Sequence, residues 1–186
     1  MMKVLLGSIL SLLLITLSPG ALADDLGQAD VAATRQVLVD ARLRALGNLF
    51  RLQPEAQKIL EEARGYALVA STGLDFGLVS TRDVAGILRD NQTGRDAFYQ
   101  SLPGRRADNL AAGIESAIIV LQTEQAFAQF REGNWDASAA PSGWEVNAQA
   151  AAPETSGSLV YRLGPRGTVD PAVLPALALQ LAPALN

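Results

Sequence analysis

The chain lacks two reactive residue types: its 186 residues include neither cysteine nor histidine. It therefore cannot form a Ser-His or Cys-His nucleophile pair, a thiolate or imidazole metal site, or a disulfide. We expect a non-enzymatic protein that needs no metal or cofactor and is stabilised by packing. Carboxylate chemistry is the alternative, as in glycosidases or calcium sites, with Glu61/Glu62 and Asp90/Asp96 as candidate pairs. Neighbouring acids on a helix point in different directions and turn acids usually cap the turn, so catalysis is disfavoured.

Basic residues are also scarce, with 15 Lys and Arg against 19 Asp and Glu and a formal net charge of -4. Non-specific nucleic-acid binding requires a basic face, so no nucleic-acid partner is expected. The same acidity opposes contact with an anionic membrane unless the basic groups are clustered.

The first 23 residues have the pattern of a cleaved secretory signal. Lys3 precedes an apolar core from Val4 to Leu17, and Ala21–Ala23 supplies small residues before the expected cleavage. The alternative is a retained anchor, which needs roughly 20 apolar residues, more than this core contains. We therefore expect a periplasmic or secreted protein without a lipoprotein cysteine. Residues 24–186 then form one domain, opening with a mobile polar leader at Asp24–Gln28.

The most informative stretch runs from Ile114 to Gly133. Ala117–Leu121 is a short apolar run rich in β-branched residues, which predicts a strand buried on both faces. Thr123 is a helix N-cap candidate, and Phe127 and Phe130 then lie three residues apart and face the same side, toward the sheet. Gly133 is placed to end this helix with a positive φ.

Other elements follow from periodicity and turn residues. Helices are predicted at Asp30–Leu52 and from Pro54 to about Ala63. Val84–Arg89 and Arg95–Gln100 flank a polar connection that ends in glycine, which predicts a hairpin. Further strands are predicted at Tyr66–Ala70, Leu74–Gly86 with kinks at its glycines, Glu145–Ala150, Ser158–Leu163 and around Leu177–Leu181. The predicted fold is α+β: a curved antiparallel sheet with an N-terminal amphipathic helix and short helices packed on it.

The Asp30–Leu52 helix carries two arginines inside its apolar stripe. At 100° per residue, Arg35 and Arg42 fall on the same side as Leu38, whereas Arg44 and Arg51 fall on the opposite, solvated side with Asp40. The two arginines allow two interpretations, because a charge on a buried face must be paired or reach water. Either the arginines reach water or carboxylates of the sheet, or this face meets anionic lipid head groups.

Two further pairs of residues allow both a structural and a functional interpretation. Arg105 and Arg106 lie in a predicted loop and either contact an anionic ligand or form solvated surface. Trp135 and Trp144 bracket a small polar stretch and either pack at the sheet edge or sit at a lipid interface.

Three consecutive parts of the chain resemble a known family. They are Pro54–Ala56 with Tyr66–Val69, Gly86–Tyr99, and Ala117–Phe130 followed by Trp135. These parts are similar to the proline-started helix and strand, the hairpin, and the strand and helix of the SYLF family. That family comprises lipid-binding domains of bacterial exported proteins and of eukaryotic actin and membrane regulators. The chain resembles a divergent member, because the glycine-dense stretches on either side of the hairpin are reduced.

The resemblance implies a non-enzymatic lipid-binding domain of the periplasm or envelope, for a phospholipid or a phosphoinositide-like lipid. In eukaryotic relatives the N-terminal amphipathic helix is associated with phosphoinositide binding, and this helix corresponds by position to Asp30–Leu52. The candidate lipid-contact residues are Arg35, Leu38, Arg42, Arg105 and Arg106. The alternative is a structural or interaction module of the envelope that binds an envelope protein or the cell wall and no lipid.

Overall fold

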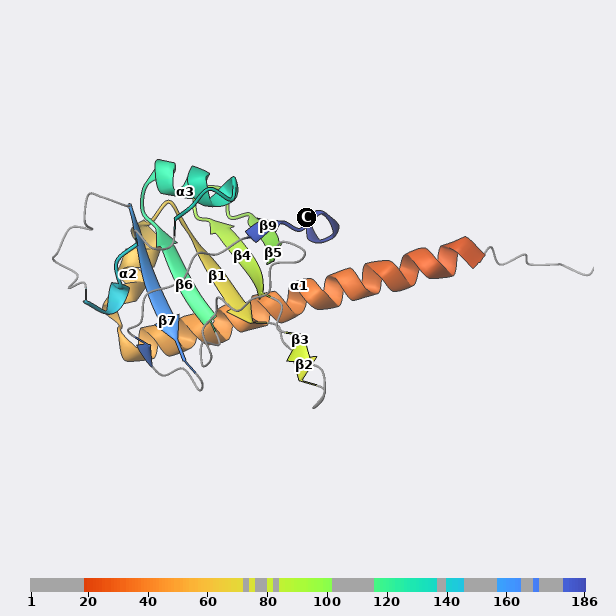
Figure 1. Ribbon diagram of the computed structural model, residues 1–186, viewed down its shortest axis with the longest axis horizontal. Coiled ribbons are helices and arrows are strands. Elements are labelled where there is room, and N and C mark those ends of the chain that lie inside the picture. The colour runs from red at the N-terminus through yellow and green to blue at the C-terminus, as the bar shows by residue number, and fades with distance from the viewer. Residues whose placement is uncertain are drawn as a thin grey trace, which may run out of the picture.

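The computed structural model (Figure 1) describes residues 19–71, 74–75, 80–81, 84–101, 116–136, 140–145, 157–164, 169–170 and 179–186. These residues form three layers, with helices α1 and α2 on one face of an antiparallel sheet and helix α3 on the other. The predicted α+β class, with an N-terminal helix and short helices packed on an antiparallel sheet, is confirmed.

Two helices precede the sheet, as the sequence predicts. Helix α1 spans Pro19–Leu52 and α2 spans Glu55–Glu62. The predicted polar leader at Asp24–Gln28 is wrong, because these residues belong to α1. Extending an existing helix costs much less than starting a new one, so the helix continues from Asp30 toward its N-terminus. Residues 1–18 lie outside the described residues, and cleavage after Ala23, a position within α1, stays a prediction.

The main sheet has seven strands in the order β8-β7-β6-β1-β4-β5-β9, and all neighbouring pairs are antiparallel. The strands are β1 (Gly65–Ser71), β4 (Val84–Asp90), β5 (Asp96–Ser101), β6 (Ser116–Leu121), β7 (Ser158–Leu163), β8 (Val169–Asp170) and β9 (Leu179–Leu181). A separate ribbon pairs β2 (Leu74–Asp75) with β3 (Ser80–Thr81). The hairpin of β4 and β5 and the strands expected at β1, β6, β7 and β9 are confirmed, whereas β8 was not foreseen.

Alternation along the strands produces two apolar cores, one on each face of the sheet. In β6, Ile119 and Leu121 belong to the core under α3, whereas Ile118 and Val120 belong to the core under α1 and α2. All four side chains are at most 1% exposed. Full burial of each large aliphatic side chain contributes about 1.5–3 kcal/mol, so the predicted two-faced strand lies at the centre of the fold's stability.

Helix α3 spans Glu124–Arg131 and begins as the sequence predicts. The hydroxyl of Thr123 accepts a hydrogen bond of 3.1 Å from the backbone N–H three residues further on. Phe127 and Phe130 are buried against the sheet. Gly133 ends the element with a φ of +76°, a conformation that glycine adopts without steric cost. The strand, cap, ring spacing and stop signal of this unit are all confirmed.

The two tryptophans pack within the domain. The Trp135 indole N–H donates to the hydroxyl of Ser158 at 3.3 Å, and the Trp144 indole N–H donates to the carbonyl of Arg162 at 3.2 Å. The Trp144 ring also meets Tyr161 edge to face, with 5.3 Å between centroids. The packing interpretation is therefore confirmed for both residues.

The strand predicted at Glu145–Ala150 is wrong at its first residue, because Gly143–Glu145 form a 3-10 turn, η2. A Cβ added at Gly143 would come within 2.4 Å of the Tyr161 ring, so the chain approaches this ring as only glycine permits. The turn places Trp144 over Tyr161. Residues 146–150 lie outside the described part of the chain.

Candidate functional site

The predicted lipid-contact face of α1 lies against the sheet. Arg42 is 9% exposed, and its guanidinium donates to both carboxylate oxygens of Asp96 on β5, at 2.7 and 3.2 Å. Arg89 on β4 donates to the same carboxylate at 3.3 Å. A two-pronged pair of this kind satisfies a guanidinium that has left water. The alternative in which the stripe arginines meet carboxylates of the sheet is therefore confirmed for Arg42.

Arg35 is also engaged inside the domain, although its partner is a backbone group. Its Nε donates to the carbonyl of Leu185 at 2.9 Å, and its guanidinium lies 5.8 Å from the centre of the Phe98 ring, within range of a cation–π contact. Leu38 is 1% exposed. Neither Leu38 nor Arg42 is available to a lipid surface in this arrangement. Arg105 and Arg106 lie outside the described residues.

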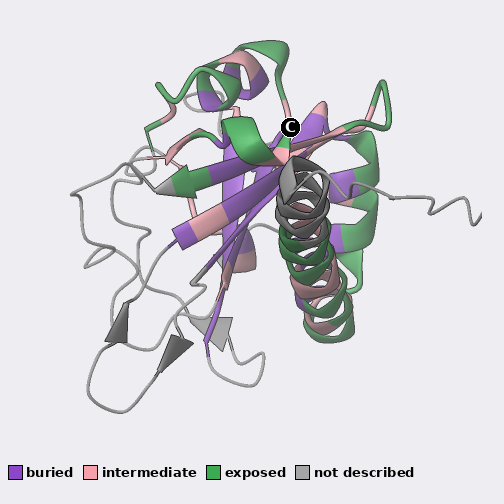
Figure 2. Ribbon diagram, turned by 90° about the vertical axis from the view of Figure 1, so that its right-hand side faces the viewer, coloured by how far each residue is buried: buried purple, intermediate pink, exposed green. Residues whose placement is uncertain are grey.

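The side of α1 that faces away from the sheet carries a different set of residues (Figure 2). Val37 is 57% exposed and Leu43 is 61% exposed. Arg44 and Arg51 are exposed on the same side, as their helical angles predict. We call Val37, Leu43, Arg44 and Arg51 the outer face of α1. The sequence analysis did not identify Val37 and Leu43 as members of this face. The seven-residue spacing of Val37, Arg44 and Arg51 is a signal that could have placed Val37 beside the two arginines.

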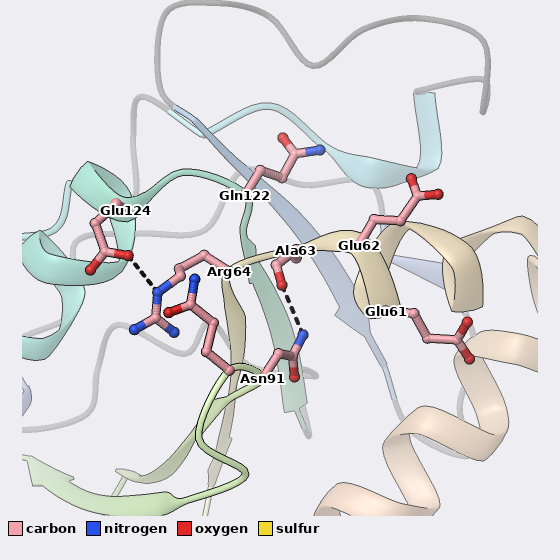
Figure 3. A pocket seen from close by; sticks show the side chains of 8 residues that line it. Glu61, Glu62, Ala63, Arg64, Asn91, Gln122 and Glu124 are labelled. Atoms are coloured by element: carbon pink, nitrogen blue, oxygen red, sulfur yellow. Dashed lines mark hydrogen bonds and ion pairs between the residues drawn. The ribbon is translucent and has the colours of Figure 1, made fainter.

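A polar pocket of about 410 Å³ lies where the end of α2, the turn between β4 and β5, and the start of α3 meet (Figure 3). It is lined by Glu61, Glu62, Ala63, Arg64, Asn91, Gln92, Gln122 and Glu124. The Asn91 amide donates to the carbonyls of Leu60 and Ala63 at 2.8 and 3.0 Å and so caps the end of α2. The side-chain oxygen of Gln122 is buried without a hydrogen-bond partner. This lining suits a donor or a cation better than an anion.

Arg64 joins the three elements around this pocket. Its guanidinium donates to both oxygens of Asp90 at 2.6 and 3.3 Å and to Glu124 at the start of α3. It also lies over the Phe127 ring, 4.1 Å from the centroid. The hydrogen bond to Asp90 raises the pKa of Arg64, and the same bond lowers the pKa of Asp90, assisted by the backbone N–H of Thr93. Both groups are therefore locked in their charged forms, with no proton to exchange near neutral pH.

The carboxylate pairs considered for catalysis are separated or engaged. Asp90 pairs with Arg64 on the α3 side of the hairpin, whereas Asp96 pairs with Arg42 on the α1 side. Glu61 accepts from Gln57 and Glu62 pairs with Lys58 on the surface of α2. Asp90 and Asp96 are thus held apart by different arginines, whereas Glu61 and Glu62 both line the polar pocket.

The described residues contain no group of three or more Asp or Glu side chains placed to hold a metal ion. No helix among them combines the length and apolar character needed to cross a bilayer.

No protein-family model matches the chain. The chain is similar to "Beta cell expansion factor A" of Aeromonas veronii, with 25% identity over 125 residues, which cover 66% of this chain and 48% of that protein. The chain therefore spans about half the length of the curated relative it matches.

Proposed function

We propose that this domain binds the surface of anionic membranes, without catalysis, through the outer face of α1. The observation that carries the proposal is the exposure of Val37 and Leu43 beside Arg44 and Arg51 on one side of a helix. Apolar side chains of an interfacial helix enter the boundary of the acyl chains, while arginines meet the phosphate groups above it. The resemblance to the SYLF family supports this function, and the expected export signal supports a periplasmic or envelope location.

The outer face of α1 replaces the contact surface suggested by the sequence. Arg35, Leu38 and Arg42 hold α1 on the sheet, and this leaves the opposite side of the helix as the outside of the layer. Each arginine close to an anionic surface contributes about 1 kcal/mol. The chain as a whole carries a formal charge of -4, so attraction must be local and should weaken as salt screens it.

A charge reversal on the outer face tests the proposal. Purified wild-type protein and Arg44→Glu are each mixed with vesicles of phosphatidylglycerol or of phosphatidylcholine, and the bound fraction is measured by sedimentation. We expect the wild type to prefer the anionic vesicles. Arg44→Glu should bind them at least about tenfold more weakly, since both the loss of the positive charge and the added negative charge oppose binding. The matched control is Lys58→Glu, because Lys58 is 76% exposed on α2 and gives the same charge change away from this face.

The controls also decide between the two classes of function. Equal weakening by Arg44→Glu and Lys58→Glu would show a general charge effect and reject the outer face as the contact. If the wild-type protein bound neither kind of vesicle, lipid binding would be rejected, and a structural or interaction module of the envelope would be the remaining candidate function. A further variant, Leu43→Ser, separates the apolar contribution: it should weaken binding even in high salt, where the arginine contribution is screened.

A further inference from the structure

Gly47 lies among the residues of the outer face of α1, on the solvent side of the helix. It is exposed, and a Cβ added there would meet nothing within 4 Å. Its backbone is helical, so neither a positive φ nor a close approach of another segment requires glycine at this position. Alanine would be the better residue for the helix itself. The glycine therefore lowers the stability of α1, and no contact among the described residues compensates for this loss.

The neighbours of Gly47 on the helix surface are members of the outer face. Leu43 and Arg44 precede it by four and three residues, and Arg51 follows it by four, so all three lie about one turn away. Side chains on a helix lean toward its N-terminus, which directs Arg51 over Gly47 and toward Arg44. The missing side chain thus leaves a space between the two arginines. We call the space bounded by Leu43, Arg44, Gly47 and Arg51 the Gly47 gap.

Both arginines at the Gly47 gap are available to a ligand. Within the part of the chain that the structure describes, no carboxylate pairs with the guanidinium of Arg44 or Arg51. The two residues lie about 10.5 Å apart along the helix axis, so two long side chains can converge on one group between them. Asp40, one turn before Arg44, accepts a hydrogen bond from Gln36 at 2.8 Å and repels an anion on that side. An anion is therefore favoured on the other side of Arg44, over the Gly47 gap.

We propose that Arg44 and Arg51 together bind one phosphomonoester head group of an anionic lipid, which enters the Gly47 gap. This inference rests on the proposed membrane function and adds the head group that the outer face selects. A phosphomonoester carries about 1.5 to 2 negative charges near neutral pH and offers three free oxygens, more than the phosphodiester of phosphatidylglycerol. Two guanidiniums present paired N–H donors to such a group. Leu43 is 61% exposed beside the gap and favours a lipid over a soluble phosphate, because it can enter the boundary of the acyl chains.

Filling the gap tests this inference without weakening the fold. In Gly47→Gln an uncharged side chain occupies the gap, and the urea midpoint should rise because glutamine is a better helix former than glycine. The matched control is Ala33→Gln, since Ala33 is exposed on the same side of α1 but about four turns away. Each protein is mixed with phosphatidylcholine vesicles that contain either phosphatidate or phosphatidylglycerol, adjusted to the same zeta potential. The bound fraction is measured by sedimentation.

The preference between the two anionic lipids is the decisive readout. We expect the wild type and Ala33→Gln to bind phosphatidate vesicles about fivefold more tightly, since one head group then engages a second arginine. Gly47→Gln should bind both kinds of vesicle equally, at the wild-type level for phosphatidylglycerol. A preference that survives in Gly47→Gln, or that is absent from the wild type, would overturn this inference and leave membrane binding standing. If the wild type bound neither kind of vesicle, the proposed function would be rejected and this inference with it.

Inorganic phosphate distinguishes a lipid from a soluble ligand. Added in the low millimolar range at constant ionic strength, it should leave the wild-type protein on phosphatidate vesicles, because it lacks the acyl chains that anchor a lipid. Release of the protein by phosphate under these conditions would overturn the assignment of a lipid as the ligand of the Gly47 gap.

Discussion

Removal of the Arg64 side chain should destabilise this domain through several separate contacts at once. It is 11% exposed and connects the end of α2 to Asp90, to Glu124 and to the ring of Phe127. In Arg64→Ala, the lost hydrogen bonds to a charged carboxylate should cost about 1.5–3 kcal/mol, and the lost ring contact about 1 kcal/mol. Asp90 keeps two backbone N–H donors, which limits the penalty. We therefore expect a loss of about 3 kcal/mol in the free energy of unfolding.

Urea unfolding followed by circular dichroism measures this loss. With a denaturant slope of about 2 kcal/mol per molar, the midpoint should fall by about 1.5 M while the slope stays unchanged. Lys58→Ala is the matched control, because its ion pair with Glu62 is 3.7 Å long and both side chains are more than two thirds exposed. That variant should lie within about 0.5 kcal/mol of the wild type.

Double-mutant cycles then assign the loss to its partners. The coupling energy between Arg64 and Asp90 should be about 2 kcal/mol, because both side chains are at most 19% exposed. The coupling to Glu124 should stay below about 0.5 kcal/mol, because this carboxylate is 67% exposed. A total loss below 1 kcal/mol, or a Glu124 coupling as large as that of Asp90, would refute the assignment of Arg64 as the joint between the elements.

Four further outcomes follow from individual residues. The pKa of Asp90 lies below its ordinary value of 3.8, so the stability that ionised Asp90 contributes is present above about pH 4 and is lost as the pH falls toward the lowered pKa. Urea midpoints measured at pH 5, 4 and 3 should show this loss, and the midpoint of Asp90→Asn should depend less on pH. Gly65→Ala should destabilise the domain strongly in thermal unfolding, because its Cβ would lie 2.4 Å from the carbonyl of Arg89. Thr123→Ala should cost about 1 kcal/mol in urea unfolding through loss of the α3 cap, whereas Thr123→Ser should retain most of it. Leu49→Ala should cost about 2–5 kcal/mol in the same assay, because Leu49 is fully buried, and a smaller loss would mean that α1 packs loosely on the sheet.

Patterns within single segments predicted most of the elements. The apolar run of β6, the cap at Thr123, the ring spacing in α3 and the stop at Gly133 each depend on residues within a few positions of one another. The leader at Asp24–Gln28 was wrong because a polar composition does not end a helix that is already formed. The two-residue β8 was missed because so short a strand carries no periodic signal.

The α1 arginines show that a local sequence pattern does not predict the partner of a side chain. The sequence placed Arg35 and Arg42 on one side of a helix, but a partner inside the protein and a lipid head group satisfy a guanidinium in the same way. In the structure the partner of Arg42 is Asp96, 54 residues away in the sequence, and not a lipid head group. For the same reason the outer face of α1 became visible only when the inner face had been located.

The sequence by itself determined the two-sided burial of the central strand, the hairpin, the presence of the helices and the exclusion of thiol and imidazole chemistry, because each depends on residue type and short spacing. The tertiary structure alone decided the strand order, the joint at Arg64 and the meeting of β9 with β5, which lie about 80 residues apart. Periodicity states which face of an element is apolar, but it does not state which distant element covers that face. That choice depends on the summed packing of the whole chain.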